Sequence, residues 1–174
     1  MMRGLLFLWG FAEATLFFIV PDVPVSFLAT GGIKRALRGA VWAAFGAVLG
    51  GTLMYSLAAV WPDTVLAVVE KVPAVSTAMV EGVRGQVQHM GAWAMFKGAF
   101  SGVPYKVYAS VFGAVRFNFL LFLLLSFPAR LLRFVLVALL INAMARIIPK
   151  RLHIPLLAAG WTIFYLLFWY LMPW

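Results

Sequence analysis

The chain has no cysteine and few charged residues. It contains two histidines and five acidic residues among 174. Without cysteine there is no disulfide framework, no thiolate nucleophile and no thiolate metal site, so redox chemistry is not indicated. Charged residues make up 11% of the chain and hydrophobic residues 65%, whereas a soluble domain has roughly 45 to 50% apolar residues. This composition is typical of an integral membrane protein.

Basic residues outnumber acidic ones by 14 to 5, which gives a net charge of +9. Such a charge suits a nucleic acid only where Lys and Arg form a solvated patch, and these residues do not cluster that way, so we expect no nucleic-acid partner. The length predicts a single membrane domain, 1–174. Its first 20 residues resemble a signal peptide, but Glu13 interrupts the apolar stretch, so we expect them to stay in the mature structure.

The N-terminal segment is apolar but interrupted by proline. Residues 5–20 are apolar, Pro21 and Pro24 then break the helix, and a second apolar piece covers 25–33. Neither piece reaches the roughly 20 residues that a membrane span needs. We therefore predict a re-entrant helical hairpin, which enters the membrane and returns to its own side.

A first full span is predicted at 39–61, so that 1–61 forms a hairpin plus a span. Lys34, Arg35 and Arg38 precede it and mark the membrane interface. Small residues recur along the span at near-helical spacing, which lets another helix approach closely. These residues are Gly39, Ala43, Gly46 and Gly50.

The most polar stretch, 62–90, follows the first span. Apolar residues recur in it every four positions, which indicates an amphipathic helix lying on the bilayer surface. The stripe consists of Val75, Met79, Val83 and Val87. We expect 62–90 to be an extracytoplasmic interfacial loop.

The pattern of the N-terminus returns in 91–145. A short apolar helix to Ala99, a break containing Gly102 and Pro104, and a second short helix to about Val115 predict another re-entrant hairpin. A span at 117–145 follows. The remaining 146–174 is predicted to be a cytoplasmic turn and a last span, 154–174, with an aromatic end suited to an interface.

The distribution of Lys and Arg predicts the orientation. Those near the N-terminus and those of the turn at 146–151 lie on one side, which the positive-inside rule assigns to the cytoplasm, together with the N-terminus. The predicted fold is thus all-α, an inverted repeat of two re-entrant hairpins with about three full transmembrane helices and an interfacial helix. The sequence leaves a homodimer open.

A set of residues spread from Glu13 to Phe134 forms a recognisable pattern. It consists of Glu13, Phe17-Phe18, Pro21-Asp22-Val23, Val103-Pro104-Tyr105-Lys106-Val107, Gly113, and Ser126, Arg130, Arg133 and Phe134. In this pattern the chain resembles the DedA superfamily, also called VTT or SNARE-associated Golgi proteins, and in particular its small YqaA-type branch. The chain departs from the family pattern at Ser26, where many members have an acid, and at Lys106, where the best-studied branches have arginine.

The resemblance implies two re-entrant hairpins and a role in moving lipids between leaflets. Recycling of a polyprenyl phosphate such as undecaprenyl phosphate, and phospholipid scrambling, are the roles proposed for different branches. We expect the protein to lie in a bacterial or archaeal cytoplasmic membrane.

Six ionisable residues fall within segments assigned to the membrane. At about 3 kcal/mol each they would cost on the order of 18 kcal/mol unpaired, more than a typical protein stability of about 5 to 15 kcal/mol. They must therefore pair or line a wet cavity, and two acids against four bases leave two positive charges for an anion. The six are Glu13, Asp22, Lys97, Lys106, Arg130 and Arg133.

A lipid phosphate fits this excess charge. We expect Lys106, Arg130, Arg133 and Tyr105 to contact the phosphate, because guanidinium forks and an ammonium group bind phosphate oxygens well. Glu13 and Asp22 are expected to carry a proton or to act as fixed counter-ions. The prolines 21, 24 and 104 are expected to shape the hairpin breaks, together with Gly102.

The predicted function is therefore that of a flippase or scramblase for an anionic lipid, with no cofactor and no metal. A structural ion-pair cluster, a proton-coupled transporter of small ions or solutes, and a non-transporting scaffold remain alternatives. An enzyme is not expected, because a lipid-phosphate hydrolase needs a nucleophile with a base and neither histidine lies in a candidate core segment.

Overall fold

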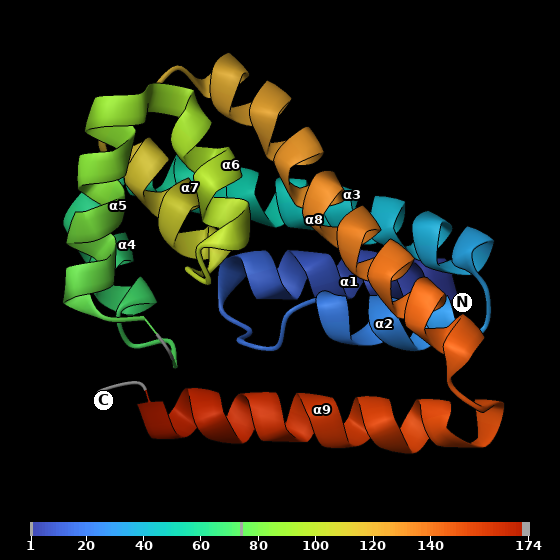
Figure 1. Ribbon diagram of the computed structural model, residues 1–174. Coiled ribbons are helices and arrows are strands. Elements are labelled where there is room, and N and C mark those ends of the chain that lie inside the picture. The colour runs from blue at the N-terminus through green and yellow to red at the C-terminus, as the bar shows by residue number, and fades with distance from the viewer. Residues whose placement is uncertain (1, 74, 172–174) are drawn as a thin grey trace.

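The structure is a computed structural model that describes residues 2–73 and 75–171, and all regular elements in this part of the chain are helices (Figure 1). The end of the expected last span, 172–174, lies outside the described residues. In chain order the helices are α1 (Met2–Thr15), α2 (Asp22–Thr30), α3 (Ile33–Val60), α4 (Pro62–Val69), α5 (Thr77–Met90), the 3-10 helix η1 (Gly91–Trp93), α6 (Ala94–Phe100), α7 (Tyr105–Ala114), α8 (Phe119–Ile147) and α9 (Lys150–Leu171).

Three helices, α3, α8 and α9, are long and apolar enough to cross a membrane. They correspond to the three predicted spans, which are therefore confirmed as long apolar helices. Two of them begin earlier than predicted, at Ile33 and Lys150, because Lys and Arg are good helix formers and their charged ends extend easily into water. At their basic ends, α3 and α9 are thus several residues longer than the apolar stretches from which the spans were predicted.

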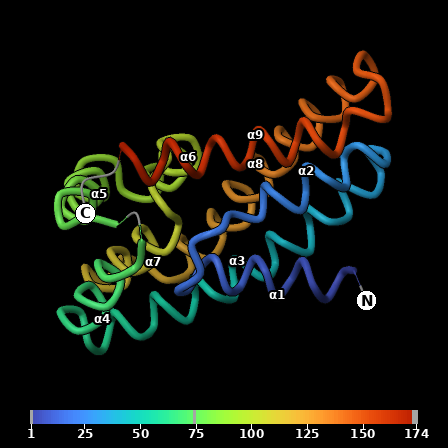
Figure 2. The backbone as a smooth tube through the Cα atoms, turned by 90° about the horizontal axis from the view of Figure 1, so that it is seen from below, coloured from blue at the N-terminus to red at the C-terminus, as the bar shows by residue number. Residues whose placement is uncertain are grey.

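Two pairs of short helices, α1–α2 and α6–α7, come from opposite ends of the molecule. Their non-helical breaks, 16–21 and 101–104, meet near the middle, as both views show (Figures 1 and 2). Gly102 has a φ of +80° in the second break, a conformation that glycine adopts at little cost. Pro21 and Pro104 each stand directly before the following helix.

The prediction that Pro24 contributes to the first break is wrong. Pro24 lies in the first turn of α2, where a backbone N–H has no partner within the helix, so proline is tolerated there. The chain leaves the helix earlier, after Thr15. The break is therefore made by 16–21, and Pro24 belongs to the start of α2.

Small residues bring α1 and α3 into close contact, as the spacing along the first span predicted. A Cβ atom added at Gly46 would collide with the backbone carbonyl oxygen of Phe7, and one added at Gly50 would lie 2.6 Å from the carbonyl oxygen of Phe11. Ala43 approaches Gly10 of α1 in the same way. Phe7 thus contacts Gly46 and Phe11 contacts Gly50, so residue numbers increase in the same direction along both helices and the helices run parallel.

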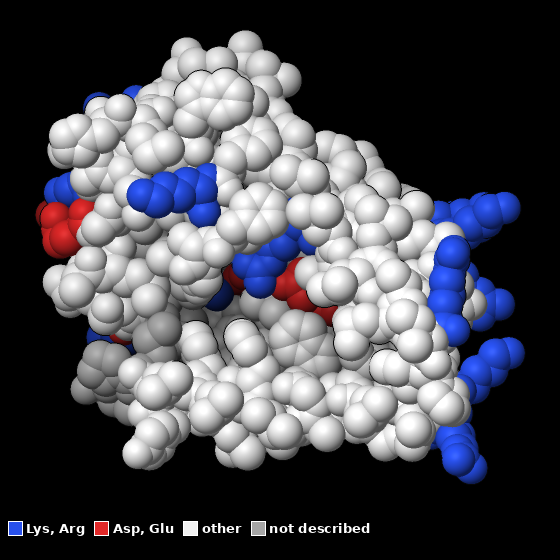
Figure 3. Space-filling view, viewed as in Figure 1, with Lys and Arg blue, Asp and Glu red and all other residues white. Residues whose placement is uncertain are grey.

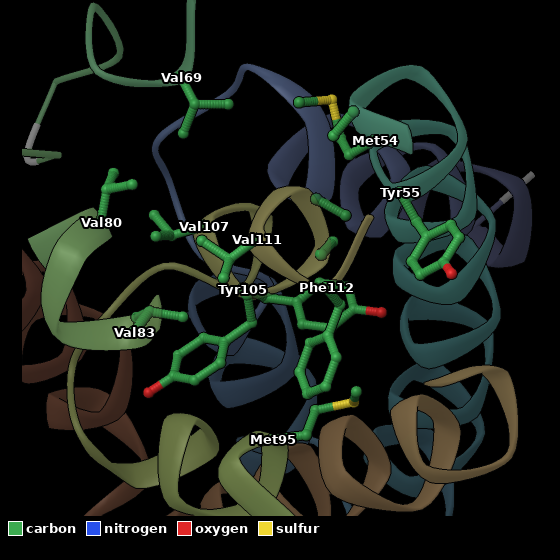
Figure 4. Close-up of a cluster of buried hydrophobic side chains, with 14 of the residues drawn as sticks. Met54, Tyr55, Val69, Val80, Val83, Met95, Tyr105, Val107, Val111 and Phe112 are labelled. Atoms are coloured by element: carbon green, nitrogen blue, oxygen red, sulfur yellow. The ribbon is translucent and has the colours of Figure 1, made fainter. Parts of the chain in front are cut away.

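The stretch 62–90 forms two helices, α4 and α5, instead of a single helix on the bilayer surface. The predicted apolar stripe faces the protein: Val83 and Val87 are buried in the hydrophobic core together with Val80. Figure 4 shows Val80 and Val83 of α5 pointing toward Val107 and Val111 of α7. The expectation that this stripe faces the bilayer is thus wrong, since the stripe packs against α7. The location of 62–90 at the membrane interface stays a prediction.

The last helix, α9, forms a separate layer beside the rest of the bundle (Figure 1). Hydrogen bonds and ring contacts connect it to the first helix pair. The indole N–H of Trp161 donates to Ser26 Oγ at 2.9 Å, and the backbone N–H of Val20 donates to the Tyr165 hydroxyl at 3.0 Å. The ring of Phe18 also contacts those of Tyr165 and Trp169. Within the described part of α9 only His153 is buried, so this helix touches the first helix pair along one side and otherwise stays exposed.

The basic residues of the N-terminus and of two turns lie at one end of the bundle, as predicted. In Figure 3, Lys and Arg side chains project from the edge where Figure 1 shows the N-terminus and the turns α2–α3 and α8–α9. We call this the basic end. It carries Arg3, Lys34, Arg35, Arg38, Arg146, Lys150 and Arg151.

Candidate functional site

Five of the six predicted ionisable residues gather where the two helix breaks meet. We call them the central charge cluster. Figure 3 shows acidic and basic side chains in a hollow above α9. Four of the five are at most 3% exposed, and Arg133 retains 23% of its side-chain exposure. The cluster consists of Glu13 at the end of α1, Asp22 and Lys106 in the first turns of α2 and α7, and Arg130 and Arg133 on α8.

Glu13 and Arg130 form a buried ion pair, with Arg130 Nη2 2.6 Å from Glu13 Oε2. The guanidinium carbon lies 5.0 Å from the ring centre of Tyr105 and 4.8 Å from that of Phe134, so two aromatic faces also contact the cation. Within the described residues Arg130 Nε has no hydrogen-bond partner. The Arg130 guanidinium thus binds Glu13 through Nη2, while its Nε donor has no partner among the described residues.

Asp22 and Arg133 form the second pair, which joins the two helix breaks. Asp22 Oδ2 accepts from Arg133 Nε at 2.9 Å and lies 2.6 Å from Arg133 Nη2. Arg133 Nη1 also donates to the backbone carbonyl of Ala99 at the end of α6, at 3.2 Å. Asp22 lies in the first turn of α2, where a negative charge interacts favourably with the helix dipole. Its other oxygen, Oδ1, has no partner in the described part of the chain.

Lys106 is the buried cation without a carboxylate partner. Its Nζ donates to the backbone carbonyl oxygen of Phe17 in the first break at 2.9 Å, and no described acidic oxygen lies within 4 Å of it. It also lies in the first turn of α7, the end of a helix that disfavours a positive charge. A buried ammonium in this position is costly, so it needs compensation from an anion or from water.

Tyr105 is part of the site through its ring more than through its hydroxyl group. The hydroxyl donates to Ser126 Oγ at 2.8 Å, and Ser126 in turn lies 3.1 Å from Met95 Sδ. The ring faces the Arg130 guanidinium. The predicted phosphate contact of Tyr105 therefore requires that the hydroxyl group leave Ser126.

A small cleft of about 70 Å³ separates the charge cluster from α9. Since a water molecule takes about 30 Å³, the cleft has room for about two waters or for a group the size of a phosphate. Its walls come from both helix breaks, from α8 and from the aromatic side of α9. The lining residues are Glu13, Phe18, Val20, Pro73, Gly102, Val103, Pro104, Tyr105, Lys106, Arg130, Arg133, Phe164, Tyr165 and Phe168.

Lys97, the sixth predicted member, is not in the cluster. Its side chain is exposed on α6, because the adjacent Gly98 and Ala99 turn the buried face of this helix inward. Three bases and two acids remain in the cluster, so the excess positive charge is one instead of the two expected from the sequence. The remaining cation is still sufficient to attract a single anionic group.

The contribution of α9 to the site was not predicted. Phe164, Tyr165 and Phe168 close the cleft, and Trp161 binds the buried Ser26. Aromatic residues in a last apolar helix resemble ordinary lipid-facing surface, so the sequence contains no signal for this role. Among the described residues there is also no group of three or more His, Asp or Glu side chains able to hold a metal ion.

The chain is similar to bacterial proteins whose names describe no function. An uncharacterized protein of Haemophilus influenzae is 28% identical over 154 residues, which cover 88% of this chain and 79% of the relative. An uncharacterized protein of Histophilus somni is 33% identical over 73 residues, covering 42% of this chain and 38% of the relative. No protein-family model matches the chain, and no solved structure matches it significantly.

Proposed function

We propose that this protein is a membrane lipid translocase, a flippase or scramblase, that holds the phosphate of an anionic lipid in the central cleft. The observation that carries the proposal is Lys106, a buried ammonium beside the cleft with a backbone carbonyl as its protein partner. The central charge cluster has one excess positive charge, which the negative charge of a phosphate would balance. Charge-assisted hydrogen bonds from Lys106 and from the unused Arg130 donor would hold it.

The short helices support a re-entrant arrangement. At 1.5 Å per residue, the 14, 9, 7 and 10 residues of α1, α2, α6 and α7 give lengths of about 21, 14, 10 and 15 Å, whereas the hydrocarbon core is about 30 Å thick. We propose that both pairs are re-entrant hairpins of an inverted repeat. With the basic end in the cytoplasm, α1–α2 opens inward and α6–α7 outward.

The size of the cleft indicates that only the phosphate of the lipid enters the protein, while its hydrocarbon chain stays in the bilayer. A space of about 70 Å³ can take a phosphate but not an acyl or prenyl chain. The chain of the lipid would remain in the membrane and pass beside α9, of whose described residues only His153 is buried. Glu13 or Asp22 would exchange a proton as the phosphate arrives, which would couple transport to a pH gradient.

The resemblance to the DedA superfamily agrees with this proposal, and membership of that superfamily is part of it. Location in a bacterial or archaeal cytoplasmic membrane is also part of it; the three helices long and apolar enough to span a membrane support the membrane location. The bound lipid is then a polyprenyl phosphate or a phospholipid.

The test is transport of fluorescent lipid phosphates in liposomes by Lys106→Met, with Lys97→Met as the matched control. Loss of a hydrogen bond to a charged group costs about 1.5 to 3 kcal/mol, so we expect Lys106→Met to slow transport by roughly tenfold or more. It should melt no earlier than the wild type, because it removes an uncompensated buried charge. Lys97→Met should transport normally. Equal transport by both variants would contradict a phosphate site at Lys106.

A transporter of soluble anions is the second candidate, and the small cleft favours it. The two candidates differ in what competes with the substrate. Inorganic phosphate outside the liposomes should have no effect on a lipid translocase but should itself be taken up by a solute transporter. Uptake of radiolabelled phosphate without lipid movement would favour this second function.

A further inference from the structure

A second cavity, far from the central cleft, lies at the basic end between α1, α2 and the start of α3. It is a groove of about 430 Å³. Four apolar residues and three arginines line it. They are Met2, Leu6, Leu28 and Gly39, and Arg3, Arg35 and Arg38.

The three arginines have no counter-charge in the protein. All three are exposed, and within residues 2–73 and 75–171 none forms an ion pair or a hydrogen bond through its side chain. Two of the five acids, Glu13 and Asp22, are bound to arginines of the central cluster, and the other three lie between positions 63 and 81. Three like charges around one groove repel each other, so an anion bound there is stabilised.

The groove also presents apolar surface to a ligand. Gly39 lets α3 approach the other two helices, because a Cβ atom there would lie 2.8 Å from Leu28 Cδ1 and 2.9 Å from Leu6 Cδ1. Leu6 is buried beneath these contacts, whereas Leu28 is half-buried and Met2 exposed, so the last two offer apolar surface to the groove. Arg35 and Arg38, three residues apart on α3, lie on the same side of their helix.

We propose that this groove binds one anionic phospholipid. The guanidinium groups of Arg3, Arg35 and Arg38 hold the phosphate, to which their planar forks are well matched. One acyl chain lies along Leu28 and Met2. The site is separate from the central cleft and shares no residue with it, so this inference goes beyond the proposed translocase function.

Positive charge near a membrane interface does not by itself explain this arrangement. A second groove at the same end, of about 280 Å³, lies between α8 and α9, and its walls carry no Lys or Arg. The nearby Arg146, Lys150 and Arg151 belong to the same basic end but not to either groove. They provide a matched control with the same number of charges.

The experiment measures how much phospholipid the purified full chain retains in mild detergent, by native mass spectrometry, together with the melting temperature. The probes are dioleoyl phosphatidylglycerol, dioleoyl phosphatidylcholine and glycerol phosphate. We expect the wild type to retain one phosphatidylglycerol and to melt later in its presence, while phosphatidylcholine and glycerol phosphate have little effect. If glycerol phosphate protects equally well, the site binds free phosphate and the lipid proposal is wrong.

The variants locate the site. The triple variant Arg3→Gln, Arg35→Gln and Arg38→Gln should bind phosphatidylglycerol about tenfold more weakly, and the triple variant Arg146→Gln, Lys150→Gln and Arg151→Gln should bind it normally. Replacing Arg3, Arg35 and Arg38 with Lys keeps the charge and should restore part of the affinity. Equal losses in the two Gln triples would mean a diffuse charge effect, and no loss in the first would mean that the groove is not the site; either result overturns the proposal.

Folding of the first triple variant is checked by size-exclusion chromatography and by its melting temperature without lipid. If it does not fold, the single variants Arg35→Gln and Arg38→Gln take its place, each with an expected loss of about threefold. Unchanged affinity in both single variants then counts against the proposal in the same way.

Discussion

The buried pair Glu13–Arg130 allows a sharp test of the central charge cluster. The two side chains are 2% and 4% exposed and their charged atoms lie 2.6 Å apart. Replacing Glu13 with Gln leaves a buried guanidinium without a counter-charge, which costs about 3 to 5 kcal/mol. This is a large share of a typical free energy of unfolding of about 5 to 15 kcal/mol, so Glu13→Gln should melt far below the wild type.

The two partners should not be equivalent. Arg130→Met leaves two acids and two bases in the central charge cluster, so its charges balance, whereas Glu13→Gln leaves one acid against three bases. We therefore expect Arg130→Met to be less destabilising than Glu13→Gln.

The double variant Glu13→Gln/Arg130→Met should be more stable than Glu13→Gln alone, because it has neither charge. The remaining deficit should be about 1 to 2 kcal/mol, since the cation contacts with the rings of Tyr105 and Phe134 are worth about 0.5 to 2 kcal/mol and a methionine sulfur replaces part of them. Unfolding in detergent micelles, followed by circular dichroism, gives the four free energies.

The surface pair Glu81–Arg84 is the control for this cycle. Its charged atoms are 3.6 Å apart and its side chains are 61% and 40% exposed, so the coupling between the two should stay below about 0.5 kcal/mol. If the costs of Glu13→Gln and Arg130→Met simply add, or if the surface pair couples as strongly, the reasoning from burial is refuted.

Three further predictions concern packing, orientation and the role of α9. Gly46→Ala should destabilise the protein through its collision with Phe7 of α1, whereas Gly82→Ala, whose new methyl group would meet nothing within 4 Å, should be neutral or stabilise α5 by about 0.5 to 1 kcal/mol; melting temperatures decide between them. Lys34→Cys should react with a membrane-impermeant thiol reagent only after the membrane is opened, and Ala78→Cys should react in intact cells; the reverse pattern would overturn the proposed orientation. Tyr165→Phe removes the hydroxyl group that accepts from the Val20 N–H and should change lipid transport with little change in melting temperature, because α9 contributes little to the core; transport at the wild-type rate would mean that α9 does not control access to the cleft.

The sequence was sufficient for those features that depend on local apolar length and on small-residue spacing. The three long helices follow from apolar stretches near the 20 residues of a span, and the contact of α1 with α3 follows from Gly46 and Gly50, which allow close approach. Five of the six predicted buried charges are indeed together. The sequence also predicted that the acids and bases of this cluster form ion pairs or line a cavity, since buried charges require partners.

Features that depend on tertiary contacts were not predictable. The stripe around Val83 has the same period whether it faces lipid or another helix, and only the position of α7 shows that it faces protein. Lys97 and Lys106 have equally apolar neighbours in sequence, yet one is exposed and the other buried. Pro24 was misassigned for another reason. Proline breaks a helix when it lies in the interior but is tolerated in the first turn, and the sequence alone does not show which position Pro24 takes.

The contacts of the central charge cluster also suggest how binding in the proposed translocase would reach the helix pairs. Lys106, at the start of α7, binds the Phe17 carbonyl in the first break, and Arg133 connects Asp22 of α2 with the Ala99 carbonyl of α6. Each contact joins one helix pair to the other. An ammonium group has three N–H donors, so a phosphate can bind Lys106 beside the Phe17 carbonyl and removes this connection only when it draws the ammonium group away from Phe17. A ligand can shift a conformational equilibrium only through contacts that differ between the two states, and the Lys106–Phe17 hydrogen bond is the contact that such a movement would break. The first break would then be released while Arg133 still holds α2 to α6.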